Sequence, residues 1–199
     1  MYSPKYAIET DRKLIDQVIS ENAFATIVYQ EDGVPQSFQL PLMLKNEKLI
    51  GHMAKANKAW KALNGRSTLV IFYGPHCYIS PTWYGTDHNV PTWNYITVHV
   101  RGAVRIVEEE AFLKEAIIEL SQKYDPTFPI EANIASHQGL LREIVGIEIQ
   151  VEQVFSKFKL AQSKPEHERL NVVKQLEKSP NQNDRLVAKA MLKTMDLKS

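Results

Sequence analysis

The spacing of apolar and polar residues divides the chain into a strand-rich middle and helical segments around it. Seven segments alternate, or run apolar, as strands do: 23–30, 34–44, 48–54, 67–73, 76–80, 93–107 and 144–160. Helical spacing marks residues 11–21, 56–65 and 108–124, and two further segments after residue 164. Residues 125–143 show neither period and are expected to be irregular.

The turn residues between these segments favour antiparallel pairing. The stretch Glu31-Asp32-Gly33 and the pair Asn46-Glu47 each separate two predicted strands, as hairpin turns do. Gly65 is a left-handed helix stop, and Gly102 predicts a bulge or bend. We therefore expect a mainly β (α+β) fold, a closed or half-closed β-barrel with peripheral helices. The Gly-rich fingerprint of a dinucleotide-binding parallel sheet is absent.

Residues 93–107 form a long predicted strand, and its two faces differ. The even positions from Asn94 to Ile106 are mostly apolar and predict the buried face. The odd positions are aromatic at one end and cationic further along: Trp93, Tyr95, Thr97, His99, Arg101 and Arg105. Such a face lies against a ligand or a second subunit. A dimer interface without a ligand fits the same pattern.

The segment GHMAKANKAW, residues 51–60, joins a strand to a helix that starts at or just after Asn57. A helix start offers unpaired N–H groups, and Lys55, Lys58 and Lys61 add cations, so a phosphate would suit this join. The alternative is that Asn57 only caps the helix and the lysines are solvated.

The last predicted strand ends FSKFKLAQS, residues 155–163, with Lys157 and Lys159 on one face. Two like charges side by side favour an anion or acids opposite them. Lysines that protect an edge strand from aggregation are the alternative.

Composition narrows the function classes. The net charge of the 199 residues is +1, so any nucleic-acid surface must be local. The single cysteine, Cys77, cannot form an intramolecular disulfide. His52, His76, His88 and His99, four of the six histidines, lack metal-ligand spacing, so no metal and no catalytic residue is assigned. No signal-peptide core and no membrane-length apolar run is present, which predicts a cytoplasmic protein without a membrane partner.

Four ordered motifs resemble those of a known family. GHMAKANKAW, GPHCYISPTWY (74–84), VPTWNY (90–95) with VHVRG after it, and KFKLAQS resemble the PaiB family, described as FMN-binding negative transcriptional regulators of protease production and sporulation. MYSPKY and FATIV extend the resemblance over nearly the whole chain. It implies an FMN-binding split β-barrel similar to pyridoxamine-phosphate oxidase, assembled as a homodimer with FMN at the subunit interface.

The resemblance also implies site residues. The phosphate-binding stretch matches His52, Met53, Lys55, Asn57 and Lys58, and the strand beneath the flavin ring matches Trp93, Asn94, Thr97 and His99. Lys159 and Gln162 match the closing segment, from the partner subunit. Met53, Lys55, Lys58, Ala161 and Ser163 replace the family's usual Leu, Arg, Pro, Ser and Asn. Lys55 keeps the charge of Arg but not its bidentate fork.

Two domains are expected: a split barrel over residues 1–163 and a C-terminal helical hairpin over residues 164–199. Residues 161–199 carry 8 Lys+Arg against 5 Asp+Glu, a net charge of +3. No recognition helix stands out, so DNA is a partner by resemblance alone. The alternatives to a regulator are a flavin-dependent oxidoreductase and a flavin-free dimeric interaction module.

Overall fold

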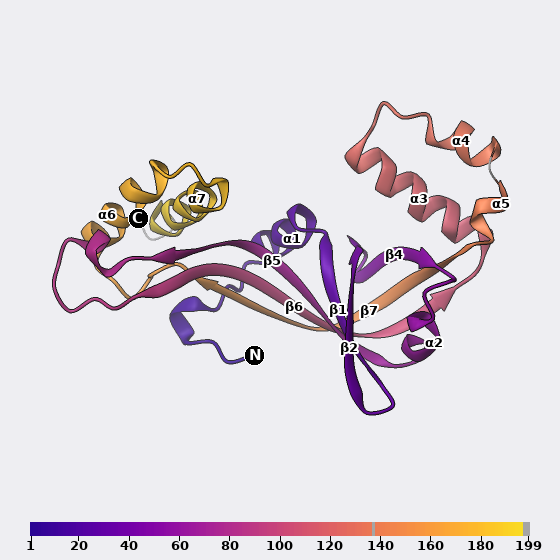
Figure 1. The fold of residues 1–199 in the computed structure, drawn as a ribbon, viewed down its shortest axis with the longest axis horizontal. Helices are drawn as coiled ribbons and strands as arrows, with labels where there is room; N and C mark the ends of the chain where they lie inside the picture. The colour runs from indigo at the N-terminus through magenta and orange to yellow at the C-terminus, as the bar shows by residue number, and fades with distance from the viewer. Residues whose placement is uncertain (137, 197–199) are drawn as a thin grey trace. The chain divides into compact units, whose positions relative to one another are not determined.

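The strands of the computed structural model, which describes residues 1–136 and 138–196, form one antiparallel sheet (Figure 1). They are β1 (Phe24–Glu31), β2 (Val34–Pro41), β3 (Met43–Lys45), β4 (Lys48–Ala54), β5 (Ser67–Ile79), β6 (Thr92–Val107) and β7 (Ile144–Lys159). Their order across the sheet is β2-β1-β5-β6-β7-β4-β3. The mainly β prediction is confirmed.

Three of the described helices flank the strand-bearing part of the sequence and four lie between its strands. They are α1 (Arg12–Glu21), α2 (Ala59–Leu63), α3 (Glu110–Tyr124), α4 (Ile130–Ser136), α5 (Gln138–Leu141), α6 (Glu166–Glu177) and α7 (Gln182–Asp196). The 3₁₀ turns η1 (Lys5–Ala7) and η2 (Pro81–Tyr84) complete the described elements. The helices α6 and α7 pack on each other as the predicted C-terminal hairpin. No described helix has the length and apolarity needed to cross a bilayer.

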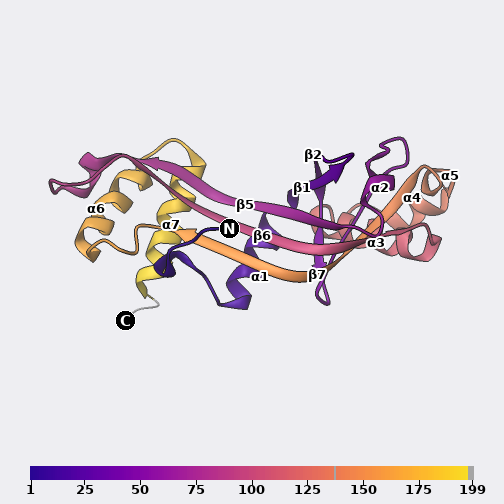
Figure 2. The ribbon, with the colours of Figure 1, turned by 90° about the horizontal axis from the view of Figure 1, so that it is seen from below.

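The chain forms two compact units. The first contains residues 1–18, 73–98 and the chain from Phe155 onward, and the second contains residues 19–72 and 99–154. The strands β5, β6 and β7, which run side by side in Figure 2, contribute residues to both units. The predicted domain boundary between residues 163 and 164 stays a prediction.

Both predicted hairpin turns are present. β1 pairs with β2 over all eight residues, from Phe24 opposite Pro41 to Glu31 opposite Val34. Asp32 and Gly33 between them both have positive φ, 50° and 78°, as a two-residue turn that matches strand twist requires. Asn46 and Glu47 adopt the same conformation between β3 and β4 without a glycine, with φ of 49° and 59°.

The strands predicted separately at 67–73 and 76–80 are one strand, β5. Burial alternates along it but shifts by one position at Pro75–His76, so that Tyr73 and Tyr78 are both exposed. This local shift has the signature of a bulge. β1 pairs with residues Leu69–Ile71 of β5 only. Pro75 lies beyond this paired stretch, so its missing N–H removes no hydrogen bond between β1 and β5.

Residues 130–136 and 138–141, predicted to be irregular, form the helices α4 and α5. Ile130, Ile134 and Leu141 are buried with Leu113 of α3 in a small apolar cluster. Ile130 and Ile134 stand four apart on one helix face, a signal too short to be recognised as a period. Burial in this cluster, rather than helix propensity, stabilises such short helices.

Two features of the second unit join β6 to its neighbours. A Cβ added to Gly102 would lie 2.2 Å from the Gln150 carbonyl oxygen on β7, so Gly102 allows close backbone approach. Glu148 of β7 accepts hydrogen bonds from Arg105 Nε and Lys48 Nζ, both at 3.1 Å. Burial alone would raise the pKa of Glu148, but the bonds from Arg105 and Lys48 outweigh it and hold the pKa below its usual range.

Candidate functional site

The predicted phosphate stretch lies where β4 ends in the second unit. Lys55 follows the last residue of the strand, and its backbone N–H donates to the Glu143 carbonyl oxygen at 2.8 Å. Its ammonium group pairs with Glu108 Oε2 at 2.8 Å. A phosphate bound here would therefore compete with Glu108 for this cation.

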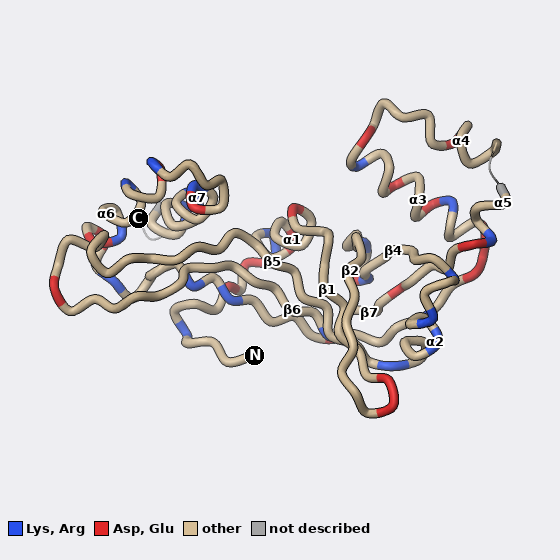
Figure 3. Tube along the Cα trace, in the orientation of Figure 1, with Lys and Arg blue, Asp and Glu red and all other residues tan. Residues whose placement is uncertain are grey.

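The turn after Lys55 is closed by its own side chains. Asn57 Oδ1 accepts from the Ala59 N–H at 3.2 Å, while Trp60 Nε1 donates to the Lys55 carbonyl oxygen at 3.2 Å. The helix α2 begins at Ala59, two residues after Asn57, and has only five residues. The N-cap of α2 is Lys58, which makes no side-chain capping bond, so the Asn57 side chain closes the turn ahead of the helix and does not occupy the cap position. Lys58 and Lys61 leave the segment cationic, and Figure 3 shows the basic positions around α2.

His52 and Met53, next to each other on β4, face opposite ways. Met53 is buried in the core. His52 is half-buried, and its Nδ1 is sealed from solvent without a hydrogen-bond partner among the described residues. Burial lowers the pKa of His52, which keeps the ring neutral near pH 7. A neutral imidazole with an unused nitrogen can bond to a ligand.

The alternation predicted for residues 93–107 is confirmed on β6 as far as Val104 and breaks at its end, where Ile106 is only partly buried and Val107 is buried. The even positions Asn94, Ile96, Val98, Val100 and Val104 are buried. Trp93 is 53% exposed and meets Tyr78 edge-on, with ring centroids 6.3 Å apart. Thr97 is buried, while His99, which belongs to the second unit, is half-buried and has its pKa lowered by burial.

Lys159 at the end of β7 meets the start of β6 in the first unit. Its ammonium group donates to Thr92 Oγ1 at 2.5 Å and to the Trp93 carbonyl oxygen at 2.8 Å. Burial lowers the pKa of Lys159. Gln162 bonds within its own turn, accepting from the Leu160 N–H at 2.8 Å and donating to the Phe158 carbonyl oxygen. The predicted site residues Lys159 and Trp93 are thus in contact. The side-chain amide of Gln162 is occupied by hydrogen bonds to the backbone at the end of β7.

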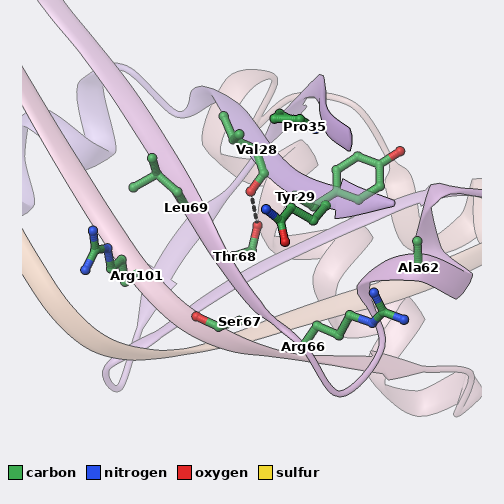
Figure 4. Close-up of a pocket in the computed structure, with 10 residues that line it drawn as sticks. Val28, Tyr29, Pro35, Ala62, Arg66, Ser67, Thr68, Leu69 and Arg101 are labelled. Carbon is green, nitrogen blue, oxygen red and sulfur yellow. Dashed lines mark hydrogen bonds between the residues drawn. The ribbon is translucent and has the colours of Figure 1, made fainter. Parts of the chain in front are cut away.

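The second unit holds a cavity of about 480 Å³, here named the arginine cavity (Figure 4). Figure 4 shows Arg66 and Arg101 at opposite ends of its lining, with Ser67 between them and Tyr29 on the wall. Its volume lies in the ~300–1,000 Å³ range of small-molecule sites. Arg101 belongs to the odd face singled out in the sequence, but Arg66 and Tyr29 carried no comparable signal.

The first unit holds a smaller cavity of about 180 Å³, here named the lysine cavity. Polar and basic side chains line it together with Tyr6, Tyr84 and Val90: His88, Asn89, Thr92, Asn94, Lys159, Ser163 and Lys164. Only Asn94 and Lys159 of this set were predicted site residues. The others come from segments whose meeting the sequence pattern does not indicate.

The chemistry of these groups fits FMN, whose phosphate is anionic and whose ring carries polar edges. Lys55 and Lys58 supply cations in one turn, and the unused nitrogen of His52 lies on the strand that leads to it. Trp93 and His99 supply an aromatic and polar strand face, whereas Thr97 on the same face is buried. The phosphate and ring residues fall in both units. Their joint action on one flavin therefore stays a prediction.

Comparison with known proteins identifies the family. A family described as "Putative FMN-binding domain" matches residues 1–153. The chain is 35% identical over 201 residues to "Protease synthase and sporulation protein PAI 2" of Bacillus subtilis, covering 96% of each chain. It is also 30% identical to an uncharacterized protein of Emericella nidulans, over 87% of this chain and 89% of the other.

Solved structures share the fold at low identity. The flavocytochrome Anf3 of Azotobacter vinelandii matches with a TM-score of 0.63 and 13% identity, over 79% of this chain and 72% of that one. The FAD and heme binding protein of Mycobacterium smegmatis matches with a TM-score of 0.65 and 13% identity, over 82% and 78%. The sheet is thus that of a flavin-binding split barrel, and FMN is the cofactor that the family match supports. The chain belongs to the PaiB family of FMN-binding proteins.

Proposed function

We propose that this protein is a homodimeric, FMN-binding negative regulator of transcription, acting on genes of the protease-production and sporulation type. The observation that carries the proposal is the similarity to PAI 2 over 96% of both chains, which spans the strands and the C-terminal helices alike. When bound, FMN supplies redox chemistry at its ring. The chain's own residues bind and orient it, and they exclude water from it.

Exposed aromatic side chains in the first unit support the homodimer. Tyr73, Tyr78 and Trp93 are 61%, 43% and 53% exposed, and Tyr78 packs against Trp93. Aromatic residues grouped on an exposed strand face are typical of interfaces. The shift of the burial alternation at Pro75–His76 leaves Tyr78 on the exposed side. A second subunit covering this face would also enclose the odd-numbered face of β6.

One set of measurements tests the proposal. The purified chain is expected to take up FMN with a stable flavin absorption spectrum and to sediment as a dimer. It should retain promoter DNA in a salt-sensitive manner that survives competitor DNA. The double variant Lys55→Glu, Asn57→Asp should lose FMN uptake and remain a folded dimer, because it places acids where the phosphate is expected. Lys13→Glu, at an exposed position in α1 outside this segment, is the matched control. Uptake by the double variant equal to that of the control would refute the phosphate assignment.

The lysine cavity favours a second candidate, a flavin-dependent oxidoreductase. A cavity lined by Lys159 and Asn94, both predicted flavin contacts, could hold a small substrate beside the ring. Consumption of NAD(P)H by the FMN-loaded protein without specific DNA retention would favour this candidate. A dimer that takes up no flavin at saturating FMN would leave an interaction module.

A further inference from the structure

The turn after β4 gathers three lysine side chains around one tryptophan. Lys58 Nζ donates to the Lys55 carbonyl oxygen at 3.4 Å, and Trp60 Nε1 donates to the same oxygen at 3.2 Å. Lys61 Nζ lies over the Trp60 ring, 5.5 Å from its centroid. Lys58 and Lys61 are therefore held at the turn by a carbonyl oxygen and an aromatic ring, and neither contact neutralises a positive charge.

The third ammonium group, that of Lys55, meets an acid. Glu108 Oε2 lies 2.8 Å from Lys55 Nζ. Glu108 belongs to the short link between β6 and α3, so its carboxylate reaches the turn from a different part of the chain. The described structure thus already places one anion at the turn where the FMN phosphate is predicted to bind.

This carboxylate occupies the position that a phosphate oxygen would take. A separation of 2.8 Å is that of a charge-assisted hydrogen bond, and phosphate oxygens bind ammonium groups at the same distance. A lysine ammonium group has three donors, so Lys55 could hold both anions at once. Two oxygens bound at that distance to one nitrogen lie at most twice as far apart, where like charges repel. The phosphate must therefore displace Glu108 or bind more weakly beside it.

The side chain of Glu108 is free to leave. It is 59% exposed, and such a partly exposed ion pair contributes little to stability. The backbone of the link is held separately, since the Glu108 N–H donates to Glu109 Oε2 at 3.1 Å. Glu109, and not Glu108, occupies the N-cap position of α3. The carboxylate of Glu108 can thus turn into solvent without breaking the start of the helix.

We propose that Glu108 is the resident anion of the phosphate site: it holds Lys55 while the site is empty, and the FMN phosphate displaces it. Glu108 is then a specificity-determining residue. It lowers the affinity for flavins that carry a phosphate and leaves the affinity for a flavin without one unchanged. This inference rests on the proposed function, because it takes the turn at Lys55 as the phosphate end of the FMN site.

The test is titration of the full-length chain with FMN and with riboflavin, followed by flavin fluorescence. Riboflavin has the same ring as FMN but no phosphate. Glu108→Gln is expected to bind FMN about tenfold more tightly than wild type, because unit charges a few ångströms apart at a partly exposed site interact on that scale. Its affinity for riboflavin should equal that of wild type.

Glu115→Gln is the matched control. Glu115 Oε1 also lies 2.8 Å from a lysine ammonium group, that of Lys45, and its side chain is 63% exposed. The variant removes the same charge from a similarly exposed ion pair outside the predicted phosphate stretch, so FMN affinity should stay at the wild-type value. A purely structural role of Glu108 at the N-terminal end of α3 would change Tm without changing the ratio of FMN to riboflavin affinity.

The outcomes separate this inference from the proposed function. Equal FMN affinity of Glu108→Gln and Glu115→Gln, or an equal gain for riboflavin, would overturn the inference alone. A gain specific to FMN without retention of promoter DNA would refute only the regulator. If wild type took up no FMN, uptake by Glu108→Gln alone would support the inference, and no uptake by either chain would overturn both.

Discussion

Gly102 offers the sharpest test of the strand packing. A methyl group at this position would lie 2.2 Å from the Gln150 carbonyl oxygen and 2.8 Å from Ile149 Cγ2. The first contact is with backbone, which cannot move aside by a change of rotamer. Overpacking a well-packed interior costs about 1–3 kcal/mol, and a backbone clash belongs at the upper end, about 3 kcal/mol. We therefore expect Gly102→Ala to be strongly destabilising.

Thermal unfolding followed by circular dichroism would measure this loss. For a chain of about 200 residues, each kcal/mol shifts Tm by about 2–4 °C, so Gly102→Ala should lower Tm by about 6–12 °C. The matched control is Gly139→Ala in α5, which adds the same methyl group where nothing lies within 4 Å. That variant should be neutral or stabilised by up to about 1 kcal/mol. If Gly102→Ala melted together with wild type, β6 and β7 could not approach as closely as described.

Three further predictions concern a thiol, a carboxylate and the exposed aromatics. Cys77 is buried, and burial together with Asp184 raises its pKa to about 12, so it should resist alkylation at pH 8 until the chain is unfolded; rapid native-state labelling would contradict this. Glu148→Gln should destabilise by about 1 kcal/mol at pH 7. Because folding lowers the pKa of Glu148, the ionised carboxylate stabilises the folded state at pH values above the unfolded pKa, and this stabilisation is lost as the group is protonated. The difference in Tm between wild type and Glu148→Gln should therefore become smaller as the pH falls below about 4. A difference in Tm that stayed constant with pH would contradict this. Tyr73→Glu should weaken the dimer at least tenfold in sedimentation, whereas Tyr124→Glu, equally exposed at 61%, should not.

Much of the sheet could be predicted because strand alternation is a long-range regularity. From Asn94 to Val104 the period of two continues, so this part of the buried face of β6 could be predicted from the sequence. The buried odd residues Thr97 and Val107 could not. The segment at 67–79 was divided in two because Gly74-Pro75 is typical of a break. Gly74 instead allows close approach of Ile96, whose Cβ would lie 3.0 Å from an added methyl group. Such an approach depends on the neighbouring strand and leaves no local signal.

Only those charged residues of the candidate site that stand out within one short sequence segment could be predicted. Lys55 and Lys159 stand out in the sequence, but the residue that neutralises Lys55, Glu108, comes from a distant part of the chain. The lysine cavity depends on the loop before β6, the turn after β7 and η1 meeting in the first unit. A histidine with an unpaired nitrogen, as His52 has, looks like any other in a sequence. Unsatisfied hydrogen bonds therefore become visible only in three dimensions.

Because side chains alternate between the two faces of β6, the strand determines whether the side chain of Asn94 can contact a flavin ring. Neighbouring residues on a strand point to opposite faces, and here Trp93 is 53% exposed while Asn94 is 1% exposed and bonds to Met191 of α7. A flat ring lying on the odd-numbered face can contact Trp93 directly, but the side chain of Asn94 lies on the far side of the strand. The predicted flavin contact of Asn94 then falls to its backbone groups. Lys159 bonds to the Trp93 carbonyl oxygen, so its ammonium group is better placed than the Asn94 side chain to contact such a ring.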